Sequence, residues 1–192
     1  MNARLDADGY ELISRAMSST QLTELQSVLE AASPTIFRRR QNGSAYAIRN
    51  VHLELSDLRS LLERGFLISL ANEIFKSPAT LVSATLFDKP PHQDLFVPIS
   101  GTTDDLRWTN WSIKAGVQYV EPPVEVQREL LAVRLHLDAC PGVNGALEVV
   151  PGSHRERLGE DAVAEFAEKA FEVCPAGPGE VLLMRPLLVH RS

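Results

Sequence analysis

Two short stretches of the chain pair a histidine with an aspartate two residues later: His92-Gln93-Asp94 and His136-Leu137-Asp138. In an extended strand, residues i and i+2 point to the same face. Each pair can therefore offer an imidazole nitrogen and a carboxylate oxygen to one point in space. Such a pair is either half of a metal site or an ordinary hydrogen-bonded His–Asp pair, and its surroundings have to separate the two.

The first pair has the setting of a ligand site. It follows Pro90-Pro91, which cannot donate backbone hydrogen bonds, and it opens an apolar run. Strand ends of this kind line the mouth of a barrel, where ligand sites are common. His190, at the end of another expected strand, offers a third ligand. Two histidines and one carboxylate can bind Fe(II) and leave positions for an oxidant and a cosubstrate. On spacing alone, an ordinary His–Asp pair and a histidine at an exposed chain end remain the alternative.

The second pair has the setting of a structural one. It lies late in LLAVRLHLDAC, an alternating run whose leucines and valine share one face. Arg134, His136 and Asp138 share the other face, where they can satisfy one another as a polar ladder. We expect this ladder, and a turn after Asp138, rather than a second metal site.

Helices are expected in the first part of the chain, about residues 1–78. Ser18 and Gln21 form a capping-box pattern ahead of leucines at helical spacing. A strand is expected over 45–51. Two further helices are expected over 57–63 and 66–76, with Gly65 between them.

Strands dominate the second part, about residues 79–192. Turn signals rich in proline and glycine separate the expected strands, and one short helix is expected over 160–170. The strands are expected over 79–88, 92–97, 111–120, 130–138, 146–150, 172–174, 180–184 and 187–190. Helices followed by many short strands predict a mainly β fold, a jelly-roll or cupin-like barrel with the N-terminal helices packed outside.

The composition is that of one ordinary domain, residues 1–192, with a net charge of −6 that argues against a nucleic-acid surface. Cys140 and Cys174 are too few for a disulfide framework and favour a reducing cytoplasm. The N-terminus lacks the apolar region of a signal peptide, and no segment approaches the roughly 18 apolar residues of a membrane span. We therefore expect a cytoplasmic protein without nucleic-acid or membrane partners; nothing in the sequence indicates its oligomeric state.

Four runs of the sequence are specific enough to indicate a family: FDK followed by HQDLFVP, then WSIKAGVQYVEPPVEV, RLHLDACPGVNGALEVVPGSHR and AGPGEVLLMRPLLVHRS. From about residue 80 to the end they resemble the phytanoyl-CoA dioxygenase family of non-haem Fe(II)- and 2-oxoglutarate-dependent oxygenases. The resemblance implies a double-stranded β-helix. It also makes His92, Asp94 and His190 the iron ligands.

The resemblance also implies residues that contact the cosubstrate. Ser192 lies two residues after the distal histidine, at a position that in this family often contacts the 2-oxoglutarate carboxylate. Lys114 and Trp111 can reach the same pocket as cofactor-binding residues; a surface lysine and a core tryptophan are the alternatives. The runs 144–145 and 151–154 match the family too, but their simpler interpretation is turn chemistry, with Ser153 or His154 capping backbone groups.

One family feature is missing from the sequence. The family places an arginine beyond the distal histidine, on a further strand, to pair with the far carboxylate of 2-oxoglutarate. This sequence stops at Ser192, and Arg191 is expected to point away from the face of His190. A missing barrel strand would expose a sheet edge, which proteins usually cover. We therefore expect that the last strand belongs to a longer natural chain; a shortened member with weaker cosubstrate binding is the alternative.

These observations predict an Fe(II)- and 2-oxoglutarate-dependent dioxygenase that hydroxylates a small organic substrate with O2 and releases succinate and CO2. Two alternatives stay open. One is a cupin-like metalloenzyme that uses no 2-oxoglutarate, and the other is a non-catalytic small-molecule-binding barrel with a vestigial triad.

Overall fold

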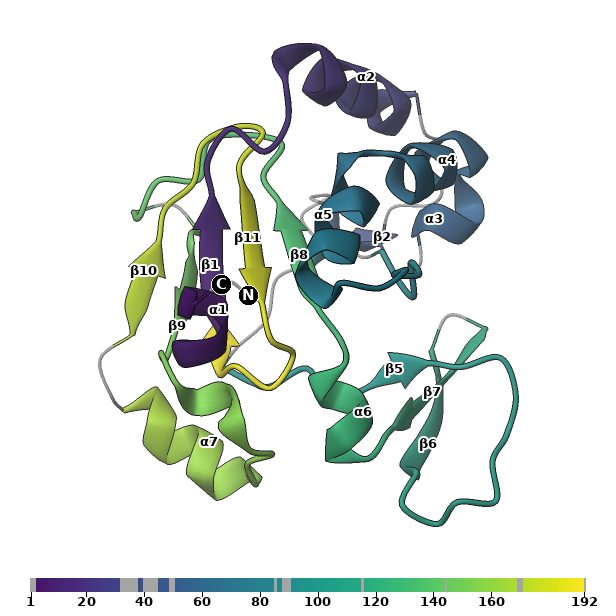
Figure 1. The fold of residues 1–192 in the computed structure, drawn as a ribbon, viewed down its shortest axis with the longest axis vertical. Helices are drawn as coiled ribbons and strands as arrows, with labels where there is room; N and C mark the ends of the chain where they lie inside the picture. Colours follow the sequence, from purple (N-terminus) through teal and green to yellow (C-terminus); the bar gives the residue numbers. More distant parts are fainter. Residues whose placement is uncertain are drawn as a thin grey trace.

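The computed structural model describes residues 3–31, 38–39, 45–48, 51–84, 86–87, 91–114, 116–143, 145–168 and 171–191. These residues are mainly β with several helices (Figure 1). Their strands pair in four three-stranded sheets, and every pairing is antiparallel.

The helices α1 (Ala3–Ala7), α2 (Ser19–Glu30), α3 (Val51–Glu54), α4 (Ser56–Arg64) and α5 (Phe66–Phe75) lie in the N-terminal part. The capping box before α2 is confirmed, because the Ser18 hydroxyl accepts from the Gln21 N–H and the Gln21 side chain accepts from the Ser18 N–H. Gly65 separates α4 from α5 as expected. Lys76 ends α5 in the left-handed conformation, with φ of 53°.

Two of the sheets form the centre of the molecule. One has the order β1 (Tyr10–Ile13), β11 (Val181–Met184), β8 (Ala132–Leu135); the other has the order β10 (Glu172–Cys174), β9 (Leu147–Val149), β12 (His190–Arg191). They pack face to face, because residues of both share one buried cluster: Tyr10, Leu147, Val149, Cys174, Leu182, Met184 and Leu188. This apolar interior holds β12, and with it His190, in place.

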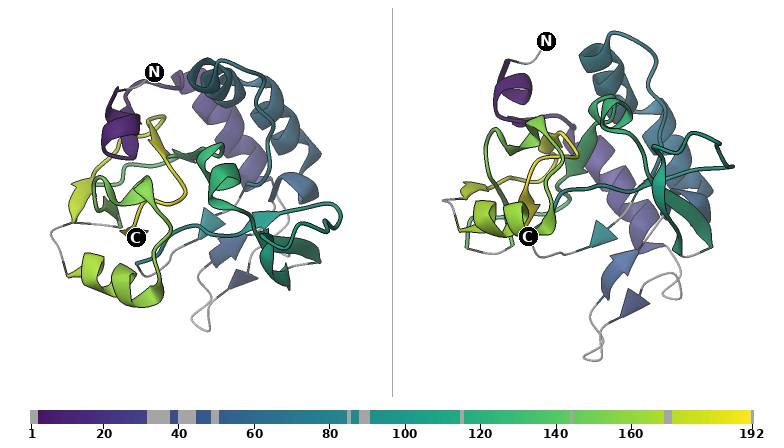
Figure 2. Two further views of the ribbon diagram at one scale, coloured as in Figure 1. Left: turned by 60° about the horizontal axis from the view of Figure 1, so that its bottom comes forward. Right: turned by 90° about the horizontal axis from the view of Figure 1, so that it is seen from below.

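Helix α5 covers the other face of the β1–β11–β8 sheet. Its side chains Phe66, Leu67, Leu70 and Ile74 pack against the buried Val181 and Leu183 of β11. Helices α2 and α4 pack on each other through Leu25 and Leu58, and this second layer also contacts β8 and the residues after it. Figures 1 and 2 show these helices gathered to one side of the central strands, as the sequence predicted.

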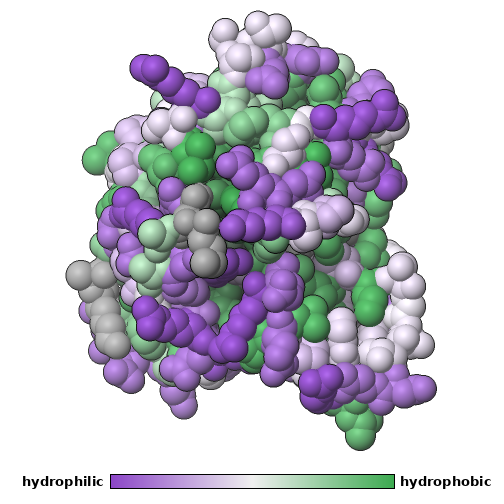
Figure 3. Space-filling view, viewed as in Figure 1, coloured by the Kyte–Doolittle hydropathy of each residue, from purple (hydrophilic) through white to green (hydrophobic). Residues whose placement is uncertain are grey.

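Two further sheets lie outside this centre. One has the order β2 (Arg38–Arg39), β3 (Ala45–Ile48), β4 (Leu86–Phe87). The other has the order β5 (Val97–Pro98), β7 (Val117–Glu121), β6 (Thr109–Lys114). Three short helices connect the later strands: α6 (Val124–Arg128), η2 (Ser153–Arg155) and α7 (Glu160–Ala167). On the face of the molecule that is seen in Figure 1, polar and apolar residues are mixed over the surface (Figure 3). No helix in the described ranges is long and apolar enough to cross a membrane.

Several strand predictions were wrong in extent. Among the described residues of the expected strand 79–88, β4 is the part that forms a strand, and residues 79–84 have no regular structure. The expected strand 111–120 is instead the hairpin β6–β7, in which Lys114 pairs with Val117 and Gly116 takes a φ of 76°. Residues 187–189 form no strand, and β12 begins only at His190. Strand β1 was not predicted at all.

Candidate metal centre

Two chain segments come together to form the candidate site. His92 and His190 form an isolated antiparallel bridge in which each backbone N–H donates to the other's carbonyl, at 3.0 Å. The Asp94 N–H donates to the Pro186 carbonyl at 2.8 Å. The segment that carries His92 and Asp94 is thus hydrogen-bonded alongside the segment that leads to His190.

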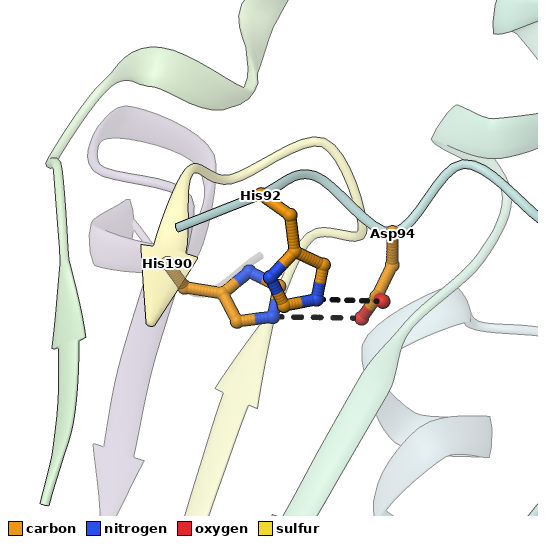
Figure 4. Close-up of side chains that lie close together, drawn as sticks. All are labelled: His92, Asp94 and His190. Atoms are coloured by element: carbon orange, nitrogen blue, oxygen red, sulfur yellow. Dashed lines mark ion pairs between the residues drawn. The ribbon is translucent and has the colours of Figure 1, made fainter. Parts of the chain in front are cut away.

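The three side chains converge on one point (Figure 4). Asp94 Oδ1 lies 3.4 Å from His92 Nε2, and Asp94 Oδ2 lies 3.7 Å from His190 Nε2. The two imidazole rings have centroids 4.3 Å apart. One ligand atom of each residue lies within 4.8 Å of the other two, so all three can bind a single ion.

The donor set fits a divalent transition metal. His190 Nδ1 donates to the Leu188 carbonyl at 2.8 Å, which fixes the ring and leaves Nε2 facing Asp94 as a metal ligand. Adjacent ligands at metal–ligand bonds of about 2.1 Å lie roughly 3 Å apart, so a bound ion requires only small inward shifts. Exposure of the side chains is 6% for His190, 21% for His92 and 33% for Asp94, so one side of the site is open to small molecules.

The second His–Asp pair has a different environment. His136 is buried, and its Nδ1 donates to the Glu180 carbonyl at 3.3 Å. Burial, together with the nearby Arg134 charge, lowers the pKa of His136. Asp138 is exposed, and among the described residues neither member of this pair belongs to a cluster able to hold a metal. The pair is therefore structural, but His136 bonds to the Glu180 carbonyl and does not join the expected ladder with Arg134 and Asp138.

The other predicted site residues are only partly visible. Ser192 lies outside the described residues. Lys114 is half-buried at the end of β6, with Nζ 3.7 Å from the centre of the Phe96 ring and 5.4 Å from that of Tyr119. Trp111, also on β6, is partly exposed, and its indole N–H donates to the Trp108 carbonyl at 3.2 Å.

The run 151–154 has a structural role, as expected. The buried Ser153 hydroxyl accepts from the Val189 N–H at 2.8 Å and donates to the Val150 carbonyl at 2.7 Å. Because Val189 precedes His190, this hydroxyl fixes the backbone next to a candidate ligand. Arg191 pairs with Glu148 at 2.7 Å and lies over the Phe171 ring.

A sequence profile described as phytanoyl-CoA dioxygenase (PhyH) matches residues 5–192 of the chain. No curated protein sequence matches it. Among solved structures, AviO1 from Streptomyces viridochromogenes Tue57 is similar, with a TM-score of 0.64 and 22% identity over 97% of this chain and 83% of that chain.

Two further solved structures have the same fold. EctD from S. alaskensis, crystallised with 2-oxoglutarate and 5-hydroxyectoine, has a TM-score of 0.65 and 19% identity over 98% of this chain and 67% of its own. SnoK, a non-heme alpha ketoglutarate dependent carbocyclase from nogalamycin biosynthesis, has a TM-score of 0.66 and 16% identity over 97% of this chain and 74% of its own. EctD has also been crystallised with bound Fe.

Proposed function

The chain belongs to the phytanoyl-CoA dioxygenase family of Fe(II)- and 2-oxoglutarate-dependent oxygenases, and from this premise we propose that it hydroxylates a small organic substrate at an iron held by His92, Asp94 and His190. The observation that carries the proposal is the convergence of one ligand atom from each residue within 4.8 Å. The similar structures act on different small molecules, so the substrate itself stays open.

Each ligand residue has a defined part in this proposal. Bound iron and 2-oxoglutarate supply the O2-dependent oxidation of a substrate C–H bond, with release of succinate and CO2. His92 and His190 bind as neutral imidazoles and Asp94 as a carboxylate, which leaves a net charge of about +1 for an anionic chelating cosubstrate. The Leu188 carbonyl holds the His190 ring in the tautomer that binds a metal through Nε2.

We propose that Lys114 contacts the 2-oxoglutarate carboxylate. Phe96 lies two residues after Asp94, and the Lys114 ammonium lies over the Phe96 ring, 3.7 Å from its centre. Ser112 leaves β6 on the same face as Lys114. Its hydroxyl is buried without a hydrogen-bond partner among the described residues, as expected beside a polar ligand.

Trp111 and Ser192 have less support as cosubstrate contacts. Trp111 lies where the register of β6 shifts between Thr109 and Ser112, and its indole N–H already donates to the Trp108 carbonyl. Of these two, Lys114 is therefore the cosubstrate contact that we favour. The role of Ser192 rests on the family resemblance alone.

We also propose that residues 1–192 form one domain whose two face-to-face sheets are the walls of a double-stranded β-helix, a jelly-roll. Their shared buried cluster supports this arrangement. The low cysteine content, two in 192 residues, supports a cytoplasmic location, and the net charge of −6 supports a function without nucleic acid.

The test is an anaerobic titration of the purified chain with Fe(II) and then 2-oxoglutarate, followed by the visible charge-transfer band of the chelate. We expect the band in the wild-type chain and its loss in His92→Ala. Lys114→Met should keep Fe(II) binding but require about tenfold more 2-oxoglutarate, because one charged contact contributes about 1.5–3 kcal/mol.

Each other outcome contradicts a different part of the proposal. An unchanged band in His92→Ala refutes the ligand assignment. Fe(II) binding without any band favours a cupin-like metalloenzyme that uses no 2-oxoglutarate. A chain that binds no divalent metal is a binding protein with a vestigial triad.

A further inference from the structure

The residue between His92 and Asp94 points away from the candidate metal site. The Asp94 carboxylate lies against His92 and His190, whereas the Gln93 side chain bonds to backbone groups of other segments. Its side chain is buried, with 7% exposed. A buried amide has to find hydrogen-bond partners inside the protein, so its partners show which segments it connects.

Gln93 uses every polar atom of its side chain. Its Nε2 donates to the Leu187 carbonyl and, at 3.0 Å, to the Glu156 carbonyl. Its Oε1 accepts from the Leu158 N–H at 2.9 Å. Two carbonyls on one end and one N–H on the other fix which end of the amide is oxygen and which is nitrogen.

These partners lie on the two segments next to the site. Leu187 is three residues before His190, on the segment whose Pro186 carbonyl also accepts from the Asp94 N–H. Glu156 and Leu158 follow the short helix η2, which contains Ser153. Gln93 therefore connects the segment carrying two candidate ligands to the segment carrying the third and to a supporting loop.

A second buried glutamine holds the other side of Asp94. Gln127, on α6, is 1% exposed, and its Nε2 donates to the Leu95 carbonyl at 2.9 Å. Its Oε1 accepts from Arg157 at 2.8 Å. Arg157 also lies 3.7 Å from the carboxylate of Glu121 at the end of β7. The backbone before Asp94 is thus anchored through the side chain of Gln93, and the Leu95 carbonyl after it accepts from the buried amide of Gln127.

We propose that Gln93 and Gln127 are positioning residues that hold the Asp94 carboxylate at the distance from His92 and His190 that a metal requires. This inference rests on the proposed function, because it concerns the same metal site. Neither glutamine contacts the candidate ion; both act on the backbone that carries the carboxylate. Outer groups that orient ligands commonly change metal affinity by 10–100-fold when they are removed.

The test replaces three glutamines one at a time with methionine, which keeps the length of the side chain and removes its polar atoms. Gln93→Met and Gln127→Met remove the two buried amide groups that hold the backbone before and after Asp94. Gln26→Met is the matched control, because Gln26 also donates to a backbone carbonyl, that of Leu137 at 2.9 Å, but on helix α2. Anaerobic equilibrium dialysis with Fe(II) gives Kd, and urea unfolding of the metal-free chain gives stability.

We expect Gln93→Met to raise the Kd for Fe(II) at least tenfold, because it removes three hydrogen bonds beside the ligands. Gln127→Met should raise it severalfold, because its contact lies one residue past Asp94. Gln26→Met should change it less than twofold. A purely structural role would lower stability in all three variants and leave the Kd values equal, and that result overturns the proposal.

The measurement separates this inference from the proposed function. A wild-type chain that binds no Fe(II) contradicts both. If the wild-type chain binds Fe(II) and Gln93→Met binds it with the same Kd, only the positioning role is contradicted. If Gln93→Met does not fold, the comparison of Gln127→Met with Gln26→Met decides: equal Kd values overturn the proposal, and a severalfold difference supports it.

Discussion

The chain contains the same three-residue pattern twice, and the two copies have different surroundings. His92 and Asp94 face His190 across a backbone bridge, with their side chains partly open to solvent. In the second copy, His136 is buried against the Glu180 carbonyl, while Asp138 is exposed. A histidine and an aspartate two residues apart therefore do not define a metal site by themselves; the partner segment does.

The residue between the histidine and the aspartate also has different partners in the two copies. Gln93 makes three hydrogen bonds to the segments around the site. Leu137 packs instead into the apolar cluster around Leu25 and Leu58, between β8 and the helices. The first pair is tied to a ligand-bearing segment, and the second is tied to the core.

The largest contrast is expected when the carboxylate of each pair is removed. Asp94→Ala should lower iron-dependent succinate release at least 100-fold, because it deletes a charged ligand that nothing else replaces. Asp138→Ala should leave the rate within twofold, because Asp138 is exposed and lies outside the cluster. Succinate formation from 2-oxoglutarate under air measures both variants. Equal losses would remove the distinction between the two pairs.

The two pairs should also differ in how metal affects stability. A ligand that binds only the folded state stabilises it by about 2.7 kcal/mol when its concentration is about 100 times its Kd. Anaerobic Fe(II) at that excess should raise the unfolding free energy of the wild type and of Asp138→Ala by this amount. The same Fe(II) concentration should have no effect on Asp94→Ala. Urea unfolding with and without metal measures the difference, and stabilisation of Asp94→Ala would place the ion elsewhere.

The middle residue of the second pair should contribute to stability without contributing to metal binding. Leu137→Ala should lower the unfolding free energy by about 2 kcal/mol, at the low end for buried leucines because Leu137 is only partly buried. The Kd for Fe(II) should stay within twofold of the wild-type value. This result is the converse of the one expected for Gln93→Met, and a large change in Kd would link the second pair to the metal site.

Sequence reasoning predicted the helices better than the strands. The start of helix α2 is predicted by Ser18 and Gln21, which form a capping box three residues apart. Strand β1 has no such signal: its four residues pair with β11, which lies about 170 residues further along the chain. The hairpin β6–β7 was predicted as one strand because the single Gly116 was not interpreted as a turn.

His92, Asp94 and His190 were predicted to share one metal by spacing and resemblance, and the structure brings one ligand atom of each within 4.8 Å of the others. The supporting residues could not be predicted, because the backbone groups to which Gln93 and Gln127 bond lie 32–94 residues away. A glutamine in the sequence gives no sign of which carbonyl it will reach. The signal that the sequence offered was the i, i+2 spacing of the ligands, which in an extended segment sends the residue between them to the opposite face.

The smallest expected effect concerns the protonation of His136. Burial lowers its pKa below the ordinary 6.5, because Nε2 has no hydrogen-bond partner in the described part of the chain and a charge there would be unsolvated. The unfolded chain then binds more protons than the folded chain, so stability should fall as the pH drops below about 6.5. His136→Asn keeps a donor for the Glu180 carbonyl and should reduce the pH dependence of stability between pH 7 and 5, measured by urea unfolding of the metal-free chain.

Part of this pH dependence should remain in the variant, because burial also lowers the pKa values of His52 and His154. Glu180 titrates below this window, since its hydrogen bond from the Gly177 N–H lowers its pKa from 4.5. An unchanged slope in His136→Asn would mean that His136 keeps an ordinary pKa, and the second pair would then be less deeply part of the core than its burial indicates.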